Sequence, residues 1–337
     1  MKKILLTTTA LTMLAGAATA GVSVTADGRM GVVNSGAVAA TLASAGWAAA
    51  NDAVIAQQVV INNAVSAAAI AAAELAMVPL AAALAAETAA GAGSAAATRV
   101  EYRYRVHFNA SGETDGGLTF GAKAGLRWDE SEAQGTVAYG SSVWMGNGTM
   151  TVRVGNTAGA IEAASGIWGS TNVGFSGMSF GGILFMANTS SSTGGTGPNQ
   201  VALDFSMGSA NITVSGAAGA NTEIAANFAA GAAKIGIGYD NGTAATGGTT
   251  VTVGFDAGSA NVNVAYFQPA AGTSSWSLGA SMGVGAGTAK AYVANKAGTQ
   301  NFGVGYNQSL GGGATLGLGY ESMGGVASME AGVSFKF

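Results

Sequence analysis

The chain has 337 residues, with 13 Lys and Arg against 17 Asp and Glu and a formal net charge of −4. Only 9% of the residues are charged, 49% are hydrophobic, 55 are glycine and none is cysteine. These values exclude disulfides and thiolate metal sites. They also argue against a disordered or collagen-like chain and against nucleic acid as a partner.

The first twenty residues have the layout of a secretory signal peptide. Lys2 and Lys3 form a short basic region, an apolar stretch covers 4–17, and small residues at 18–20 form a cleavage site. We therefore predict that residues 1–20 are removed on export and that Gly21 is the mature N-terminus. Removing the two lysines leaves 13 − 2 = 11 basic residues against 17 acidic ones, a net charge of −6.

Residues 22–33 alternate apolar and polar side chains at period two, which predicts a strand. The following segment, 34–97, has a different composition. It contains no basic residue, and 29 of the 61 residues from 37 to 97 are alanine. Because alanine is the best helix former, this segment is predicted to be a helical insert between the first and second strands.

The insert has the signals of a helical hairpin. Asn51 and Asp52 can cap a first helix that runs to about Val78, and Pro79 can begin a second helix that ends near Gly91. Gln and Asn side chains interrupt the apolar runs, which argues against a membrane-spanning helix. The hairpin could project from the cell surface, pack across an oligomer or plug a barrel, and its weak polarity favours packing against protein.

After the insert, residues 98–108 (TRVEYRYRVHF) again alternate at period two. One face is apolar and aromatic and carries Val100, Tyr102, Tyr104, Val106 and Phe108. The other face is strongly charged and carries Arg99, Glu101, Arg103, Arg105 and His107. An aromatic face opposite a charged face indicates a strand whose two sides meet different environments.

The same alternation predicts sixteen strands, with all three prolines outside them. The predicted strands cover 22–33, 98–108, 117–128, 135–145, 149–155, 201–207, 211–217, 222–229, 233–240, 250–256, 261–267, 275–284, 288–295, 301–310, 314–321 and 326–337. Tight Gly, Ser and Asn turns follow the even-numbered strands, and the longest connections follow the first and fifth strands. An even strand number with tight turns at one end is typical of a transmembrane β-barrel.

A soluble β-sandwich is the alternative, but it needs large side chains on its inner face. Here the second face is mostly Gly, Ser, Thr and Asn, as at Gly303, Gly305, Asn307 and Gly317. Glycine cannot fill a core, whereas it can line a water-filled lumen, and sixteen strands make a barrel too wide to fill with its own side chains. We therefore predict an all-β, 16-stranded antiparallel transmembrane β-barrel with its apolar face toward lipid.

All six arginines fall on the lumen face of the first, second, third and fifth strands. They are Arg29, Arg99, Arg103, Arg105, Arg127 and Arg153. Lys123 and His107 share this wall and are predicted to line the pore with them. A one-sided cationic wall favours anions unless another surface opposes it. The candidate surface is the segment 156–199 after the fifth strand, which is predicted to fold inward as a constriction loop and carries a single acid, Glu162.

Several stretches resemble the general diffusion porins of alphaproteobacteria, of the Rhodobacter type. They are VTADGRMGVV at 24–33, SGETDGGLTFGAKAGLR at 111–127, GNTAGAIEAASG at 155–166 and the terminal Phe337. The resemblance covers nearly everything except 34–97. It implies a homotrimeric channel in the cell outer membrane, surrounded by lipid and narrowed by its third loop, that passes small hydrophilic solutes and ions.

The resemblance also implies roles for single residues. Arg29, Arg103, Arg105 and Arg153 correspond to the basic side of the constriction, and Glu162 lies on the matching loop. Such porins usually carry more acids on that loop, so a strongly polarised constriction is not implied for this chain. Phe337 corresponds to the C-terminal signal that the barrel-assembly machinery reads.

Two other function classes are alternatives to a diffusion channel. An outer-membrane hydrolase needs a nucleophile and an oriented base, but the only histidine, His107, lies among arginines and has no evident nucleophile partner. We therefore predict no catalytic residue, no cofactor and no metal site. The remaining alternative is a structural or adhesive surface barrel, in which the insert 34–97 plugs the pore or binds a partner.

Overall fold

The structure is a computed structural model of the chain. It describes residues 21–37, 45–63, 66–91, 95–129, 137–163, 173–176, 200–217, 221–242 and 247–337. The predicted signal peptide at 1–20 and most of the predicted constriction loop at 156–199 lie outside the described residues. Two compact units are present, one formed by residues up to Asn34 and from Thr98 to Phe337, the other by Ser35–Ala97.

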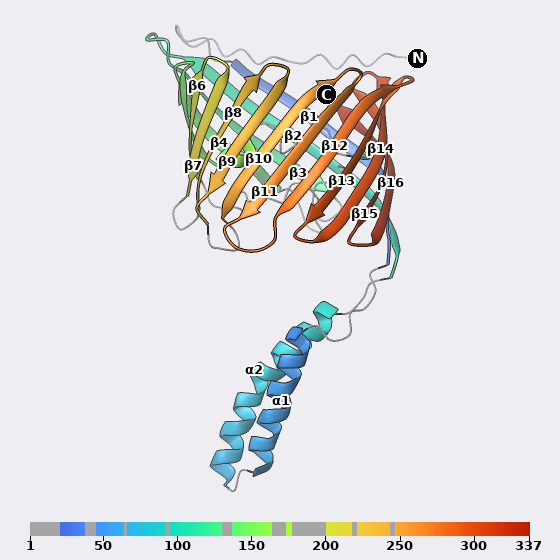
Figure 1. The fold of residues 1–337 in the computed structure, drawn as a ribbon. Coiled ribbons are helices and arrows are strands. Elements are labelled where there is room, and N and C mark those ends of the chain that lie inside the picture. Colours follow the sequence, from blue (N-terminus) through green and yellow to red (C-terminus); the bar gives the residue numbers. More distant parts are fainter. Residues whose placement is uncertain are drawn as a thin grey trace, which may run out of the picture. The chain divides into compact units, whose positions relative to one another are not determined.

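The first unit is a closed barrel of sixteen strands in which each strand pairs with its sequence neighbours and β1 pairs with β16 and β2 (Figure 1). The strands are β1 (Gly21–Ser35), β2 (Ala97–Glu113), β3 (Thr119–Asp129), β4 (Val137–Gly146), β5 (Met150–Gly155), β6 (Gln200–Met207), β7 (Ala210–Gly216), β8 (Thr222–Ala230), β9 (Ala233–Asp240), β10 (Gly248–Ala257), β11 (Ala260–Pro269), β12 (Ser275–Val284), β13 (Gly287–Lys296), β14 (Thr299–Gly311), β15 (Ala314–Met323) and β16 (Val326–Lys336). Closure leaves no sheet edge with unpaired backbone groups. The predicted fold class is confirmed.

The two faces of each strand differ as the alternation predicted. On β2, Val100, Tyr102, Tyr104 and Phe108 are 70%, 50%, 43% and 41% exposed on the outer face. Tyr104 lies opposite Trp128 of β3, with ring centroids 5.7 Å apart. The inner face of β12 instead carries Ser275, Ser277 and Ser281, all buried. The barrel is therefore apolar outside and polar inside, the reverse of a soluble barrel.

Two-residue turns join most strands of the second half of the chain. At four of them, glycine comes first with a positive φ: Gly208 (62°), Gly231 (62°), Gly258 (68°) and Gly285 (58°). A two-residue hairpin needs this left-handed backbone to match the twist of its strands, and only glycine adopts it without steric cost. All four follow even-numbered strands, as predicted.

The second unit is a helical hairpin of α1 (Ala45–Asn63) and α2 (Ala67–Gly91). The hairpin was predicted, but its break was placed wrongly, between Val78 and Pro79. Instead, α1 ends at Asn63, α2 begins at Ala67, and Pro79 lies inside α2. No helix in the described part of the chain has the length and hydropathy needed to cross a membrane.

Local hydrogen bonds explain where α2 begins. The Ser66 hydroxyl accepts from the N–H of Ala69 at 3.2 Å, the geometry of a helix N-cap. The side chain of Gln57 on α1 donates to the carbonyl of Ala73 on α2 at 2.8 Å and ties the two helices together. Proline removes one hydrogen bond inside a helix, and here the alanine-rich turns on both sides of Pro79 continue the helix across that gap.

We expect Pro79→Ala to stabilise the helical unit by up to about 3 kcal/mol, because it restores the missing backbone donor inside α2. Ser66→Ala should destabilise the helical unit by about 1 kcal/mol, because it removes the N-cap. Thermal unfolding of the full chain, followed by circular dichroism at 222 nm, measures both. A helix break at Pro79 would instead make Pro79→Ala neutral or destabilising.

Candidate functional site

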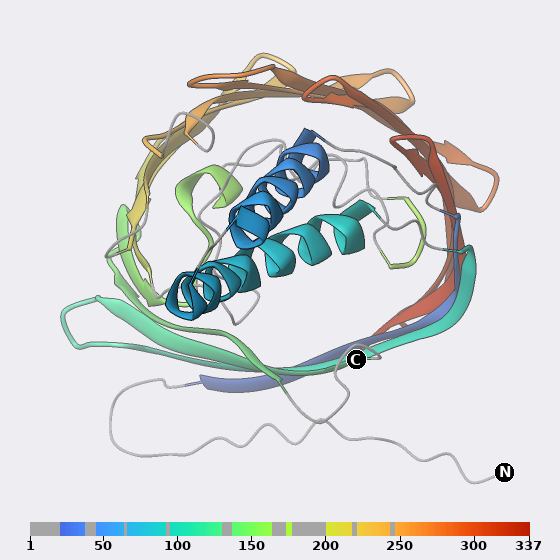
Figure 2. The same ribbon diagram turned by 90° about the horizontal axis from the view of Figure 1, so that it is seen from below.

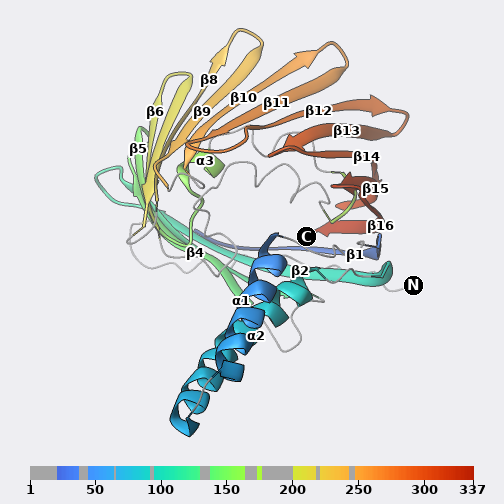
Figure 3. The same cartoon turned by 60° about the horizontal axis from the view of Figure 1, so that its bottom comes forward.

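The segment after β5 enters the barrel, where its short helix α3 (Ala160–Ala163) lies inside the ring of strands (Figures 2 and 3). The N–H of Ala160 donates to the Ser215 hydroxyl on β7 at 2.7 Å, and the N–H of Ile161 donates to the Glu223 carboxylate on β8 at 2.9 Å. Ile161 is only 1% exposed. The first anchor of the loop is therefore the inner wall formed by β7–β9.

A second anchor holds residues 173–176 against the other side of the barrel. The Ser176 N–H donates to the Glu330 carboxylate on β16 at 2.8 Å, and the Ser176 hydroxyl donates to the same carboxylate. Arg29 on β1 donates to the Ser176 carbonyl at 2.6 Å. Charge-assisted bonds of this kind are about twice as strong as neutral ones, and both anchors use a wall glutamate as acceptor.

Glycines on the inner face of β14–β16 make room for the second anchor. A Cβ on Gly305 would lie 2.9 Å from the Cβ of Val173, and one on Gly317 would lie 2.8 Å from the Cα of Phe175. A Cβ on Gly332 would lie 2.8 Å from the Phe175 ring. The prediction that the inner-face glycines line open water is therefore wrong at Gly305 and Gly317, which seat the loop.

The two anchors lie on opposite walls. Glu223 is on β8 and Glu330 is on β16, eight strands apart in a closed ring of sixteen. Eleven residues lie between Ile161 and Val173, and the twelve steps from one position to the other reach about 40 Å when extended. The inward fold predicted for the third loop is confirmed for its described residues. On the wall of β1–β5, the second anchor contacts β1 at Arg29 and Gly31.

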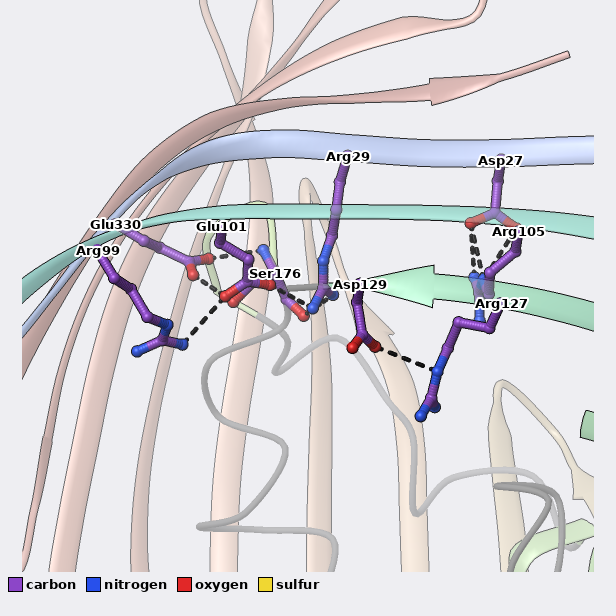
Figure 4. A network of polar contacts seen from close by, with 9 residues as sticks. All are labelled: Asp27, Arg29, Arg99, Glu101, Arg105, Arg127, Asp129, Ser176 and Glu330. Carbon is purple, nitrogen blue, oxygen red and sulfur yellow. Dashed lines mark hydrogen bonds and ion pairs between the residues drawn. The ribbon is translucent and has the colours of Figure 1, made fainter. Parts of the chain in front are cut away.

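That wall carries the predicted arginines, and most of them pair with carboxylates on the same wall (Figure 4). Arg29 on β1 forms an ion pair with Glu101 on β2. Arg99 pairs with the other oxygen of Glu101 at 3.1 Å. Glu101 is only 2% exposed, so its two arginine partners offset the cost of burying its charge.

A second group forms around Asp27 of β1. Arg105 donates to both carboxylate oxygens of Asp27, from Nε at 2.9 and 3.1 Å, and its Nη2 lies 2.8 Å from Oδ1. The Nε2 atom of His107 lies 2.7 Å from Oδ2. Arg105 lies directly opposite Arg127 of β3 in the ladder, a repulsive arrangement that the carboxylates relieve.

Two further arginines have acidic partners of their own. Arg127 pairs with Asp129 at 3.1 Å within β3. Arg153 on β5 binds Asp204 on β6 through two parallel bonds of 2.6 and 2.8 Å. Arg153 also donates to Thr157 at the start of the inward segment. This forked pair fixes both position and orientation, which a single ion pair does not.

The remaining predicted residues take different places. Arg103 lies on the inner face of β2 without a carboxylate partner among the described residues. Lys123 lies on β3 opposite Asn109 and Ser142, and Glu162 lies in α3. Phe337 is 74% exposed, stacks on Phe335 with ring centroids 6.2 Å apart, and its N–H donates to the carbonyl of Ala26 at 2.8 Å.

Glu162 of the inward segment stays a predicted partner of the arginine wall. Among the described residues, the carboxylates that pair with arginines come from the strands: Asp27, Glu101, Asp129 and Asp204. The signal that could have found Glu101 was present, because it shares the charged face of 98–108 with four basic residues. Within the described part of the chain, no three His, Cys, Asp or Glu side chains are grouped to hold a metal ion.

The chain is similar to known proteins in sequence and in fold. The sequence model of a family described as Gram-negative porin matches residues 36–329. A protein described as "Porin" from Fuscovulum blasticum is 30% identical over 124 residues, which are 35% of this chain and 43% of that protein, less than half of its length. Solved structures of two triple mutants of the Rhodopseudomonas blastica porin have TM-scores of 0.67 and 0.66 at 19% identity, covering 94% of this chain and 100% of theirs. These structures share its fold.

Docking of the second anchor is testable with a single thiol, because the chain contains no cysteine. In a Ser176→Cys background, we expect Gly317→Val to raise the rate of maleimide labelling by about tenfold or more, because the added side chain displaces Phe175 and frees the anchor. Gly283→Val is the matched control, since a Cβ there meets nothing within 4 Å. Equal labelling rates in the two variants would show that the glycine seat does not hold the loop.

Proposed function

The chain belongs to the Gram-negative porin family, whose barrels lie in the outer membrane, and we propose from this that it is a diffusion channel for small hydrophilic solutes and ions. The observation that carries the proposal is that two described pieces of the inward segment are held on opposite walls of a closed barrel, one by Glu223 and one by Glu330. A barrel of this strand number encloses an aqueous lumen, and a loop held inside it narrows the passage without sealing it. A channel of this kind performs no covalent chemistry, so no catalytic residue is assigned.

We place the passage beside the wall of β1–β5. The pore-lining residues in this proposal are the predicted basic side chains: Arg29, Arg99, Arg103, Arg105, His107, Lys123, Arg127 and Arg153. Glu162 faces the same lumen from α3. Because most of these cations have carboxylate partners within about 3 Å, the wall presents polar groups to water with little net field, which suits passage of solutes of either charge.

Three finer points belong to the same proposal. Residues 1–20 act as a cleaved signal peptide, because their layout fits one. The chain assembles as a homotrimer, as its resemblance to Rhodobacter-type porins implies. Phe337 is the residue that the barrel-assembly machinery reads, and its exposed ring, stacked on Phe335, supports this role.

The proposal predicts stepwise, ohmic conductance when the purified mature protein is added to a planar lipid bilayer in potassium chloride. The expected reversal potential in a salt gradient is small, because the wall charges are largely compensated. Silence from a folded barrel that shifts its gel mobility on heating would contradict an open channel. It would favour the alternative in which the helical insert plugs the pore.

Asp27→Asn should shift the reversal potential toward anion selectivity, because it leaves Arg105 and His107 without their carboxylate partner. The shift should be larger at 0.01 M than at 1 M salt, where the screening length falls from about 30 to about 3 Å. Asp256→Asn on β10 removes the same charge from another part of the barrel and is the control. A shift of equal size in both variants would show that Asp27 does not govern the wall.

Deleting the insert distinguishes a diffusion channel from a structural or adhesive barrel. The helical unit Ser35–Ala97 is compact in itself, so its deletion should leave the barrel able to close. A channel lacking residues 37–97 should keep or gain conductance. Retained folding with lost conductance would instead make the insert part of the conduction path, and loss of surface binding with an unchanged pore would favour the adhesive alternative.

A further inference from the structure

A cavity of about 420 Å³ opens on the inner side of β1, β2 and β16. Charged side chains on its walls are Asp27, Arg29, Arg103, Arg105 and Lys336, together with His107, and Phe175 of the inward loop also lines it. Its position joins the second loop anchor to the arginine wall. The cavity is large enough for a small solute together with water.

The charges around this cavity do not all cancel. The network drawn in Figure 4 contains four arginines (29, 99, 105 and 127) and four carboxylates (27, 101, 129 and 330), so its sum is zero. Arg103 lies outside that network although it lines the same cavity. Its neighbour across the ladder, Asp129, is paired with Arg127 instead. Arg103 and Lys336 are therefore the positive charges at this cavity that no carboxylate among the described residues pairs with.

Two guanidinium donors at this place also lack acceptors. The Nε atoms of Arg103 and Arg29 are buried, and neither has a hydrogen-bond partner among the residues that the structure describes. Buried polar atoms are nearly always bonded, and an orphaned donor calls for a specific explanation such as an ion. A surplus cation with an orphaned donor beside a cavity is the arrangement that an anion would complete.

The donor geometry selects the kind of anion. A guanidinium presents its N–H groups in a flat fork that matches two oxygens of one carboxylate or phosphate group, whereas a spherical halide accepts without this match. Phe175 places an apolar surface beside the cavity, which lowers the local dielectric and strengthens a charged bond.

We propose that this cavity is a binding site for a small oxyanion, a carboxylate or a phosphate, held by Arg103 with Arg29 beside it. The site rests on the proposed channel function and adds a saturable step to it. Oxyanions that enter the lumen dwell at Arg103 before they pass, while chloride does not. The channel thereby retains one chemical class of solute in preference to others of similar size.

The test is single-channel recording of the full mature protein in potassium chloride, with sodium phosphate or sodium acetate added to one side at constant ionic strength. We expect either oxyanion to lower the chloride current along a saturating curve. Arg103→Gln should raise the half-blocking concentration by about tenfold or more. Lys290→Gln removes one inner-face cation from β13 and is the charge-matched control, expected to leave the half-blocking concentration within about twofold of the parent.

Each outcome decides a different point. Saturating block that Arg103→Gln alone weakens supports the site, and the more effective of phosphate and acetate identifies the anion class. A conducting parent with no block, or equal weakening by Arg103→Gln and Lys290→Gln, overturns the site but leaves the channel intact. A parent protein that folds and stays silent overturns the channel proposal instead. If Arg103→Gln fails to fold, Arg103→Lys keeps the charge without the fork and should still weaken block.

Discussion

Closure of the sheet is the constraint on which the rest of the structure depends. Inside a bilayer no water is present to bond an unpaired backbone group, so a strand can cross only if both of its neighbours complete its ladder. Pairing of β1 with β16 satisfies this condition around the ring. Once the ring is closed, the period-two alternation sends aromatic side chains such as Tyr102 and Tyr104 outward and leaves charged and small residues inside.

The inner surface is organised by carboxylates as much as by arginines. Glu223 and Glu330 hold two points of the inward loop through backbone N–H groups, and Glu101 and Asp27 hold four basic side chains on the wall. Removing one partner of such a buried pair costs more than the pair contributes, because the other charge remains without compensation. Loop position and wall charge are therefore linked through Arg29, which bonds both Glu101 and Ser176.

The sequence was sufficient for features that depend on periodicity, and insufficient for those that depend on contacts between distant strands. Alternation at 98–108 predicted the faces of β2, and glycine-rich turns predicted the hairpins. The alanine content predicted the helical hairpin. The break was misplaced because Pro79 is a strong sequence signal for a helix boundary, whereas the N-cap at Ser66 is a weak one. Gly317 was predicted to line the lumen, because nothing near it in the sequence shows that Phe175, about 140 residues earlier, packs on it.

The two-residue glycine turns also bear on how the chain reaches this structure. Pairing across a turn such as Gly208 to Ser209 brings together residues that are near in sequence, so little chain entropy is lost before contacts form. The β1–β16 pairing joins opposite ends of the chain and is the longest-range contact in the barrel. Loop-closure entropy rises only as the logarithm of length, by about 0.6 kcal/mol per doubling. A 63-residue unit, Ser35–Ala97, therefore fits between β1 and β2 at small thermodynamic cost, and this connection is where evolution can lengthen the chain without reopening the ring.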